Sequence, residues 1–300
     1  MKLQFDVRGK SQPDPFIFED NGTFYLYVTA MDGVEAYSTA DPFGVWHFEG
    51  IVGAVEGRCD YWAPSVTKYN DRYYLYVSCW GDPERTQCMH VLSADSPLGP
   101  FAEPVKFYDH FSIDSHVVET DDGLFLWYAK NGRGDRPGTR VFVDKLLDPL
   151  TPANEACEVI VPTFDEEKFE PENSNWHTIE GPLWFCENGW QYVIYSGGCY
   201  QNDTYHLGYV SAKSDEPDLR KVNFVKHTKD GAFDPLMIKN EFEEGSGHNS
   251  VLKYKGEYYA VYHARDFDEE DPAKERRTAR ICKLHVKDGV ITAERYPDRV

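Results

Sequence analysis

Alternating apolar and polar residues, interrupted by tight-turn signals, recur five times along the chain. Each copy contains a short apolar run, a turn, and a second run rich in tyrosine and phenylalanine. The copies begin near Asp14, Pro64, Asp114, Glu180 and His248. Such alternation is typical of half-buried β-strands, and Asn-Gly or Asp-Gly at the turn favours a hairpin of two antiparallel strands. The pattern predicts a protein built almost entirely from β-hairpins.

The spacing of the copies indicates how the hairpins are arranged. Their turn positions are Gly22, Asp71, Gly123, Gly189 and Gly256, so successive copies lie roughly 50 to 67 residues apart. Each interval accommodates four short strands, and self-similarity at about this period is typical of a β-propeller. A helical solenoid does not fit Tyr-rich runs beside Asn-Gly turns, and an open sandwich would not explain five equivalent copies. We therefore predict an all-β fold, a single five-bladed β-propeller domain spanning residues 1–300.

Equivalent positions of a closed rotational repeat converge on its axis, which brings candidate chemistry into view. The first strand of each copy is predicted to lie innermost. Counting back eight or nine residues from the turn positions reaches Asp14, Ala63, Asp114, Glu180 and His248. Like charges crowded at one channel are costly unless a function uses them. The three carboxylates are therefore predicted to share one pocket and to act together.

Composition and charge restrict the partners. The chain has 51 acidic and 31 basic side chains, a formal net charge of -20. Nucleic acids and anionic membrane surfaces bind clustered Lys and Arg, so neither is expected as a partner, and no run approaches the roughly 18 apolar residues of a spanning helix. Residues 1–10 show no secretory signal, and the 7 Cys are scattered without disulfide or metal-ligand spacing. These features predict a cytoplasmic protein and indicate no particular oligomeric state.

Three converging carboxylates suit the cleavage of glycosidic bonds. One carboxylic acid protonates the leaving oxygen while another carboxylate activates water; a separation of roughly 6.5–9.5 Å gives inversion and roughly 5–5.5 Å gives retention. A third carboxylate beside the acid raises the pKa of that acid by like-charge repulsion. The alternative from another class is a sugar-binding propeller without catalysis, which would not require a matched acid and base.

The same residues resemble glycoside hydrolase family 43. The motifs are Asp14-Pro-Phe-Ile, Trp62-Ala-Pro, Ile113-Asp114 and Ile179-Glu180-Gly-Pro, in the order expected there, and the resemblance runs from about residue 12 to the C-terminus. It implies a five-bladed propeller and a reaction that inverts the anomeric configuration without a cofactor. By this resemblance Asp14 is the general base, Glu180 the general acid, and Asp114 the residue that tunes and orients the acid.

The resemblance also implies a substrate class. Terminal α-L-arabinofuranosyl and β-D-xylosyl residues are equally expected, and galactan-directed members of the family are a further alternative. Short imported oligosaccharides are expected, in keeping with a cytoplasmic location. A retaining, fructan-hydrolysing five-bladed group is another alternative, but its Asn-Asp-Pro and Arg-Asp-Pro signatures are missing around Asp14 and Asp114.

Several aromatic residues and one histidine are candidates for the pocket. Trp62 is expected to stack on a sugar ring, whereas Trp127 and Trp184 are expected in the core, and Trp176 or His177 at the pocket rim. His248 is expected to face the channel and bind substrate. By the resemblance, His248 also supports a central ion, often calcium, directly or through water.

An arginine near the last repeat is expected to contact the substrate's hydroxyl groups. The resemblance favours Arg280, which starts an apolar strand. Arg276 and Arg277 are the alternatives, but we expect these two to pair with the acidic loop 266–271 instead.

Overall fold

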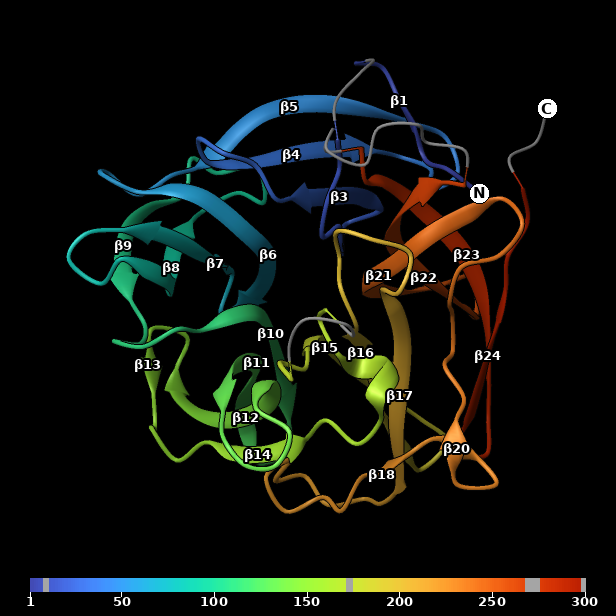
Figure 1. The fold of residues 1–300 in the computed structure, drawn as a ribbon. Coiled ribbons are helices and arrows are strands. Elements are labelled where there is room, and N and C mark those ends of the chain that lie inside the picture. Colours follow the sequence, from blue (N-terminus) through green and yellow to red (C-terminus); the bar gives the residue numbers. More distant parts are fainter. Residues whose placement is uncertain (8–10, 171–174, 268–275, 298–300) are drawn as a thin grey trace.

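The computed structural model describes residues 1–7, 11–170, 175–267 and 276–297. These residues form five sheets, antiparallel except for one short parallel pairing in the first, arranged around a central axis like the blades of a propeller (Figure 1). The only helix in these ranges is a short 3-10 turn, η1 (Asp165–Glu167). No helix in the described part of the chain is long and apolar enough to cross a membrane. The predicted all-β, five-bladed propeller is confirmed.

The first three blades follow one another along the chain, each running from the axis outward. The strands of blade 1 are β2 (Phe16–Asp20), β3 (Thr23–Val28), β4 (Val34–Thr39) and β5 (Val45–Gly53), with β1 (Gln4–Phe5) added outside β5. The strands of blade 2 are β6 (Cys59–Tyr69), β7 (Arg72–Gly81), β8 (Thr86–Ala94) and β9 (Ala102–Lys106). The strands of blade 3 are β10 (Ile113–Thr120), β11 (Gly123–Gly132), β12 (Gly138–Asp148), β13 (Thr151–Pro152) and β14 (Cys157–Ile160).

The last two blades complete the ring. The strands of blade 4 are β15 (Ile179–Glu187), β16 (Trp190–Gly197), β17 (His206–Lys213) and β18 (Val225–Lys226), followed by a small hairpin of β19 (Thr228–Lys229) and β20 (Ala232–Phe233). The strands of blade 5 are β21 (Glu243–Tyr254), β22 (Glu257–Asp266), β23 (Thr278–Lys287) and β24 (Val290–Glu294). The inner strands β2, β6, β10, β15 and β21 contact one another in turn around the axis.

A separate apolar cluster fills each interface between neighbouring blades. Blade 1 meets blade 2 through residues such as Tyr27 and Leu75, and blade 3 meets blade 4 around Trp127, which is fully buried as predicted. Leu26 and Val261 belong to the cluster that joins blade 1 to blade 5. Because every blade buries one cluster on each side, the ring must close before its core is complete.

The N-terminal segment helps to close the ring. The backbone N–H of Leu3 donates to the carbonyl oxygen of Ala279 at 2.9 Å, and that of Gln12 donates to the carbonyl oxygen of Arg277 at 2.8 Å. The beginning of the chain is thus hydrogen-bonded to blade 5. This connection places Asp14, which starts blade 1, beside residues more than 230 positions away.

Five equivalent residues at the starts of the inner strands have left-handed backbone conformations. The inner hairpins turn after Asp20, Tyr69, Thr120, Glu187 and Tyr254. Six residues before each of these lies a residue with φ between 44° and 62°, and the five are Asp14, Ala63, Asp114, Gly181 and His248. This conformation interrupts the strict alternation of side chains at the point where each strand meets the axis.

One predicted equivalence is therefore wrong. Gly181, not Glu180, holds the fourth equivalent position, and Glu180 directly precedes it. Sequence reasoning took Gly123 as the turn residue of the third hairpin, but Gly123 pairs as the first residue of β11, and the turn residues are Asp121 and Asp122. A count of nine residues back was therefore accepted in blades 3 and 4, where eight is correct. Counted from the true turns, the interval to the left-handed residue is the same in all five blades.

Candidate active site

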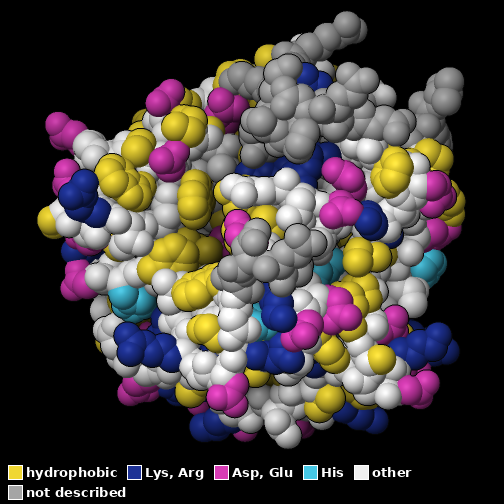
Figure 2. All heavy atoms as spheres, viewed as in Figure 1, with side chains coloured by type: hydrophobic (Ala, Val, Ile, Leu, Met, Phe, Trp, Pro, Cys, Tyr) yellow, Lys and Arg dark blue, Asp and Glu magenta, His cyan; other side chains and the backbone are white. Residues whose placement is uncertain are grey.

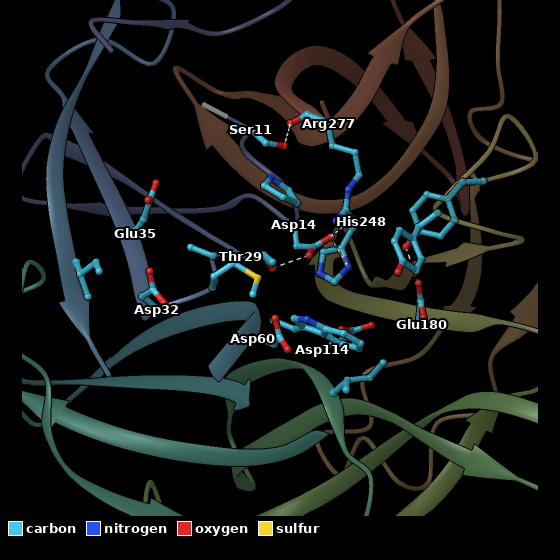
Figure 3. Close-up of a pocket in the computed structure, with 18 residues that line it drawn as sticks. Ser11, Asp14, Thr29, Asp32, Glu35, Asp60, Asp114, Glu180, His248 and Arg277 are labelled. Atoms are coloured by element: carbon cyan, nitrogen blue, oxygen red, sulfur yellow. Dashed lines mark hydrogen bonds and ion pairs between the residues drawn. The ribbon is translucent and has the colours of Figure 1, made fainter. Parts of the chain in front are cut away.

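A cavity of about 550 Å³ opens at the axis, where the inner strands begin. The three predicted carboxylates, Asp14, Asp114 and Glu180, all line it (Figure 3). Asp114 lies on β10 and Glu180 on β15, and Asp14 lies two residues before β2 begins. Asp14 and Asp114 are 8% and 5% exposed, so both carboxylates are removed from bulk water. The structure therefore brings together the three side chains that sequence reasoning grouped.

Asp14 is held by contacts on both of its carboxylate oxygens. The Thr29 hydroxyl donates to Oδ2 at 2.6 Å, and Nη1 of Arg277 donates to Oδ1 at 3.3 Å. The backbone N–H of Asp14 donates to Nδ1 of His263 at 3.1 Å, and Nδ1 of His248 lies 3.6 Å from Oδ1. These contacts come from blades 1 and 5 and fix the orientation of the carboxylate.

The pKa of Asp14 reflects a contest between burial and charge. Burial would raise it, but the Arg277 guanidinium, followed by His248 and His263, outweighs burial and holds the pKa well below its usual range. A cation beside a carboxylate favours the ionised form. Burial lowers the pKa of His263 to about 4, although its contact with Asp14 acts in the opposite direction, so this imidazole is neutral near pH 7. Asp14 is therefore a carboxylate near neutral pH.

Asp114 and Glu180 show the opposite shift. Burial raises the pKa of Glu180 to about 7, and the charge of Asp14 adds to this, whereas Tyr205 and Arg277 oppose it. Burial, together with repulsion from Glu180 and Asp14, raises the pKa of Asp114 well above its usual range. Two neighbouring buried carboxyls cannot both ionise cheaply, so the pair retains a proton near neutral pH.

Each member of this carboxyl pair receives one hydrogen bond from blade 4. The backbone N–H of Gly181 donates to Oδ2 of Asp114 at 2.9 Å. The Tyr205 hydroxyl donates to Oε1 of Glu180 at 2.7 Å. Glu180 is more exposed to the cavity than Asp114. Of the two, Glu180 is therefore the carboxyl group better placed to meet a bound ligand.

Two further candidates lie where they were expected. Trp62 and His248 both line the cavity, and Trp62 is 36% exposed, so its indole presents an apolar surface to a ligand. Trp176 and His177, expected at the rim, do not line the cavity; the His177 ring contacts Arg136 and the backbone oxygen of Asn175 instead.

The predicted roles of two arginines are reversed. Arg280 does not line the cavity: it donates to Glu243 at 3.1 Å and to Asp266 at 2.9 Å. Arg277 lines the cavity and contacts Asp14, and Arg276 is exposed. On β23, Ala279 and Ile281 face the cluster shared with blade 1. The alternation of a strand therefore turns Arg280 towards the opposite face. Residues 268–271 of the acidic loop lie outside the described residues.

A wall of the cavity combines apolar and acidic side chains. Met31 and Ile51, which are 62% and 54% exposed, line it together with Asp32, Glu35 and Asp60. These residues belong to blades 1 and 2, and the face of the molecule in Figure 2 shows apolar and acidic side chains mixed over these blades. This wall offers apolar surface and hydrogen-bond acceptors, but no positive charge.

The ion expected beside His248 does not fit the residues around it. Burial lowers the pKa of this histidine, and a cavity of about 10 Å³ beside it accommodates about one water molecule. His116 Nδ1 and both amide atoms of Asn249, which line that small cavity, have no hydrogen-bond partner among the described residues. Calcium takes six to eight oxygen ligands, and the described residues contain no group of three His, Cys, Asp or Glu side chains that could hold a metal.

Sequence reasoning missed three residues that contact the carboxylates and set a fourth, Arg277, aside. Thr29, His263 and Arg277 touch Asp14, and Tyr205 touches Glu180. Thr29 and His263 end aromatic, apolar runs that were interpreted only as strands. Tyr205 precedes the strand β17, a part of the blade that the five-fold repeat does not compare. The signal available for Arg277 was its position just before β23, which was weighed and set aside in favour of Arg280.

The chain is similar to curated enzymes over most of its length. It is 24% identical, over 97% of the chain, to an extracellular exo-α-(1→5)-L-arabinofuranosidase of Streptomyces avermitilis. It is 25% identical, over 84% of the chain and 78% of the relative, to the extracellular exo-α-(1→5)-L-arabinofuranosidase ArbA of Cellvibrio japonicus. The chain spans 66% of the length of the Streptomyces protein and about half of another relative, so these activities belong to longer proteins.

These relatives contradict the predicted cytoplasmic location, because both are named extracellular. The expectation of short imported substrates depended on that location and is no longer supported. Free thiols were one argument for the cytoplasm, and all seven cysteines are indeed free. Buried thiols such as Cys79, whose pKa burial raises to about 12, are unreactive in either compartment and do not report the location.

A solved structure and a family model both match nearly the whole chain. The crystal structure of a thermostable family-43 glycoside hydrolase matches with a TM-score of 0.82 and 25% identity, over 98% of this chain and 96% of that one. The family model described as glycosyl hydrolases family 43 matches residues 7–291, and the chain belongs to this family, as the resemblance indicated.

Proposed function

We propose that the protein is an inverting glycoside hydrolase that releases terminal α-L-arabinofuranosyl or β-D-xylosyl residues from oligosaccharides. Asp14 is the general base, Glu180 the general acid, and Asp114 the residue that tunes the acid. The observation that carries the proposal is the opposite displacement of two carboxyl pKa values in one cavity: that of Asp14 is lowered and that of Glu180 is raised. Two carboxyl groups whose pKa values differ in this way can act separately, one as the base and the other as the acid.

The base acts on water. Asp14 is ionised and oriented by Thr29 and Arg277, so one of its oxygens accepts a proton from a water molecule on one face of the sugar. The water oxygen forms a bond to the anomeric carbon as the glycosidic bond on the opposite face breaks. The anomeric configuration is inverted because attack and departure occur on opposite faces.

The acid completes the reaction. Glu180 transfers its proton to the departing glycosidic oxygen, so the leaving sugar departs as a neutral hydroxyl compound. Because burial raises its pKa to about 7, Glu180 holds a proton at higher pH than an ordinary glutamate does and can act as an acid near neutral pH. Asp114 supports the protonated form through the shared charge of the pair. Proton exchange with solvent then returns Asp14 and Glu180 to their starting states.

The walls of the cavity favour neutral sugars. Trp62, Met31 and Ile51 offer apolar surface to a sugar ring. Asp32, Glu35 and Asp60 accept hydrogen bonds from hydroxyl groups and repel carboxylates, so uronic acid residues are disfavoured. A volume of about 550 Å³ lies in the range of pockets for drug-sized ligands, which leaves room for more than one sugar ring. The names of the two extracellular relatives favour arabinofuranosides over xylosides.

A panel of nitrophenyl glycosides and neutral arabino- and xylo-oligosaccharides tests the proposal on three variants. Asp14→Asn is expected to reduce kcat about 10²- to 10⁴-fold on every substrate. Glu180→Gln is expected to affect nitrophenyl substrates much less than oligosaccharides, because a good leaving group needs little protonation. Asp32→Asn, which removes a carboxylate from the same cavity, is the control and is expected to change KM rather than kcat.

Two outcomes would contradict the proposal. Sugar binding without turnover of any glycoside would indicate a binding propeller. Retained configuration in the first product, followed by NMR, would contradict the assignment of Asp14 as a base acting on water, since a retaining enzyme uses a carboxylate as its nucleophile.

A further inference from the structure

We propose that Tyr205 is a positioning residue that holds the Glu180 carboxyl group in the orientation needed for proton donation. This inference rests on the proposed function and adds a residue to it. Tyr205 precedes β17 in blade 4 and lines the cavity.

The hydrogen bond between Tyr205 and Glu180 is short and engages one of the two carboxyl oxygens. The Tyr205 hydroxyl donates to Oε1 of Glu180 at 2.7 Å, and among the described residues this is the one hydrogen bond recorded for that carboxyl group. A glutamate has several rotatable bonds, and a single fixed donor restricts them. With Oε1 occupied, the other oxygen, Oε2, remains available to carry the proton towards a glycosidic oxygen.

The tyrosine ring is itself tightly held. Tyr205 is 1% exposed, and its ring stacks on His263 with centroids 5.6 Å apart and planes 8° apart. A Cβ atom at Gly247 would lie 2.0 Å from the ring, so only glycine at this position leaves room for it. The ring is thus packed between blades 4 and 5, and its hydroxyl has a defined position.

The Tyr205 ring also links the proposed acid, Glu180, to the proposed base, Asp14. His263, on which Tyr205 stacks, has its Nδ1 atom 3.3 Å from Oδ1 of Asp14. One side chain therefore touches the acid directly and packs on a histidine that touches the base. Such packing fixes the distance between acid and base more firmly than either contact alone.

Removal of the Tyr205 hydroxyl is expected to raise the pKa of Glu180. A donor to a carboxylate stabilises its charged form, so the Tyr205 hydrogen bond lowers the pKa of Glu180 while burial raises it. The titratable and charged groups that face Glu180 from the surrounding elements are Asp14, Asp114, Cys199, Tyr205, His248 and Arg277. Only the contribution of Tyr205 changes when its hydroxyl is deleted.

The test compares Tyr205→Phe with Tyr209→Phe. Tyr209 lies on β17, is also 1% exposed, stacks on His227, and uses its hydroxyl to accept a hydrogen bond from the Ile291 backbone. Tyr209 does not line the cavity and therefore reports the general effect of losing a buried tyrosine hydroxyl. The substrates are a nitrophenyl arabinofuranoside and a neutral arabino-oligosaccharide, each measured across pH.

For Tyr205→Phe we expect kcat/KM on the oligosaccharide to fall about 10- to 100-fold, against less than about threefold on the nitrophenyl substrate. The alkaline limb of the pH profile should move up by about one pH unit, because the pKa of Glu180 rises. Tyr209→Phe should leave the limb and the substrate ratio unchanged. Parallel losses on both substrates with an unmoved limb would overturn the inference and indicate a merely structural tyrosine.

A second measurement covers the case in which Tyr205→Phe does not fold. Incorporation of 3-fluorotyrosine at position 205 keeps the ring and makes the hydroxyl a stronger donor, so the alkaline limb should move to lower pH. An unchanged limb would again overturn the inference. If Asp14→Asn and Glu180→Gln keep full activity, the proposed function fails instead, whatever Tyr205→Phe does.

Discussion

Gly181 donates its backbone N–H to Oδ2 of Asp114 at 2.9 Å, although the two residues hold the same position in successive blades. Both have left-handed backbones, with φ of 58° and 62°. The blade that lacks a side chain at this position therefore supplies a backbone donor to the carboxylate of its neighbour. This places Glu180, one residue earlier, at the edge of the cavity beside Asp114.

Gly181→Ala is expected to reduce both stability and activity. A left-handed backbone costs a non-glycine residue about 1 kcal/mol. The added Cβ would also lie 3.2 Å from Nδ1 of His248 and 3.3 Å from the Ser196 hydroxyl, which shifts the donor to Asp114. Gly189→Ala is the control, because Gly189 also has a positive φ, of 77°, but has nothing within 4 Å. Urea unfolding should show a loss in both variants, while kcat/KM falls only in Gly181→Ala. Equal activity in the two would contradict a role for this donor.

Asp114→Asn is expected to move the alkaline limb of the pH profile to lower pH. The substitution removes the carboxyl that shares a proton with Glu180, so the pKa of Glu180 falls and less of the acid is protonated at pH 7. The direction is opposite to that expected for Tyr205→Phe. Initial rates on an oligosaccharide across pH measure it, and a limb that stays in place would show that Asp114 does not tune the acid.

Glu180 is expected to make the folded protein less stable as pH rises. Its pKa is raised in the folded state from 4.5 to about 7, so the folded state binds the proton more tightly. Its contribution is most favourable below pH 4.5 and is lost as pH rises through 7. Glu180→Gln should therefore gain stability relative to the native chain as pH rises from 4.5 to 8, by about 3 kcal/mol at the upper end.

The control for this prediction is Glu187→Gln on the same strand. The hydrogen bond from Lys253 is the largest cause that lowers the pKa of Glu187, so this residue stays ionised throughout that pH range. Its effect on the free energy of unfolding should be constant from pH 5 to 8. Urea unfolding of the three proteins at several pH values measures both effects, and parallel curves for the two variants would refute the raised pKa of Glu180.

The two arginines are expected to respond differently to substitution by methionine. Arg277→Met removes the cation beside Asp14, so the pKa of Asp14 rises, the acid limb of the pH profile moves up, and kcat/KM falls about 100-fold. Arg280→Met leaves the fully buried Glu243 without one of its partners, which costs about 3 kcal/mol of unfolding free energy. Its kcat/KM should change less than about threefold. Activity measured across pH and urea unfolding distinguish the two variants. Loss of activity in Arg280→Met with unchanged activity in Arg277→Met would show that Arg280, not Arg277, acts at the site.

The five hairpins could be read from the sequence because their signals are local. Alternation within a strand and the residues of a tight turn act over a few positions, and Asn-Gly stands at two of the five inner turns, Asn21-Gly22 and Asn188-Gly189. The same repetition also grouped Asp14, Asp114 and Glu180, because Asp14 and Asp114 hold equivalent strand starts and Glu180 lies one residue before the equivalent position, Gly181. Composition was less informative, and the predicted location was wrong because free cysteines and an N-terminal segment do not determine it.

Tertiary structure decided which side chains complete the site. Whether Arg277 or Arg280 faces the cavity depends on how β23 packs between two apolar clusters, and this cannot be read from two arginines three residues apart. Tyr205 reaches Glu180 only when blade 4 has folded, because the two residues lie 25 positions apart on either side of β16, and His263 reaches Asp14 only because the ring closes between blades 5 and 1. The opposite pKa shifts arise in the same way: burial and charges that are distant along the chain act on a carboxyl only after folding brings them within a few ångströms.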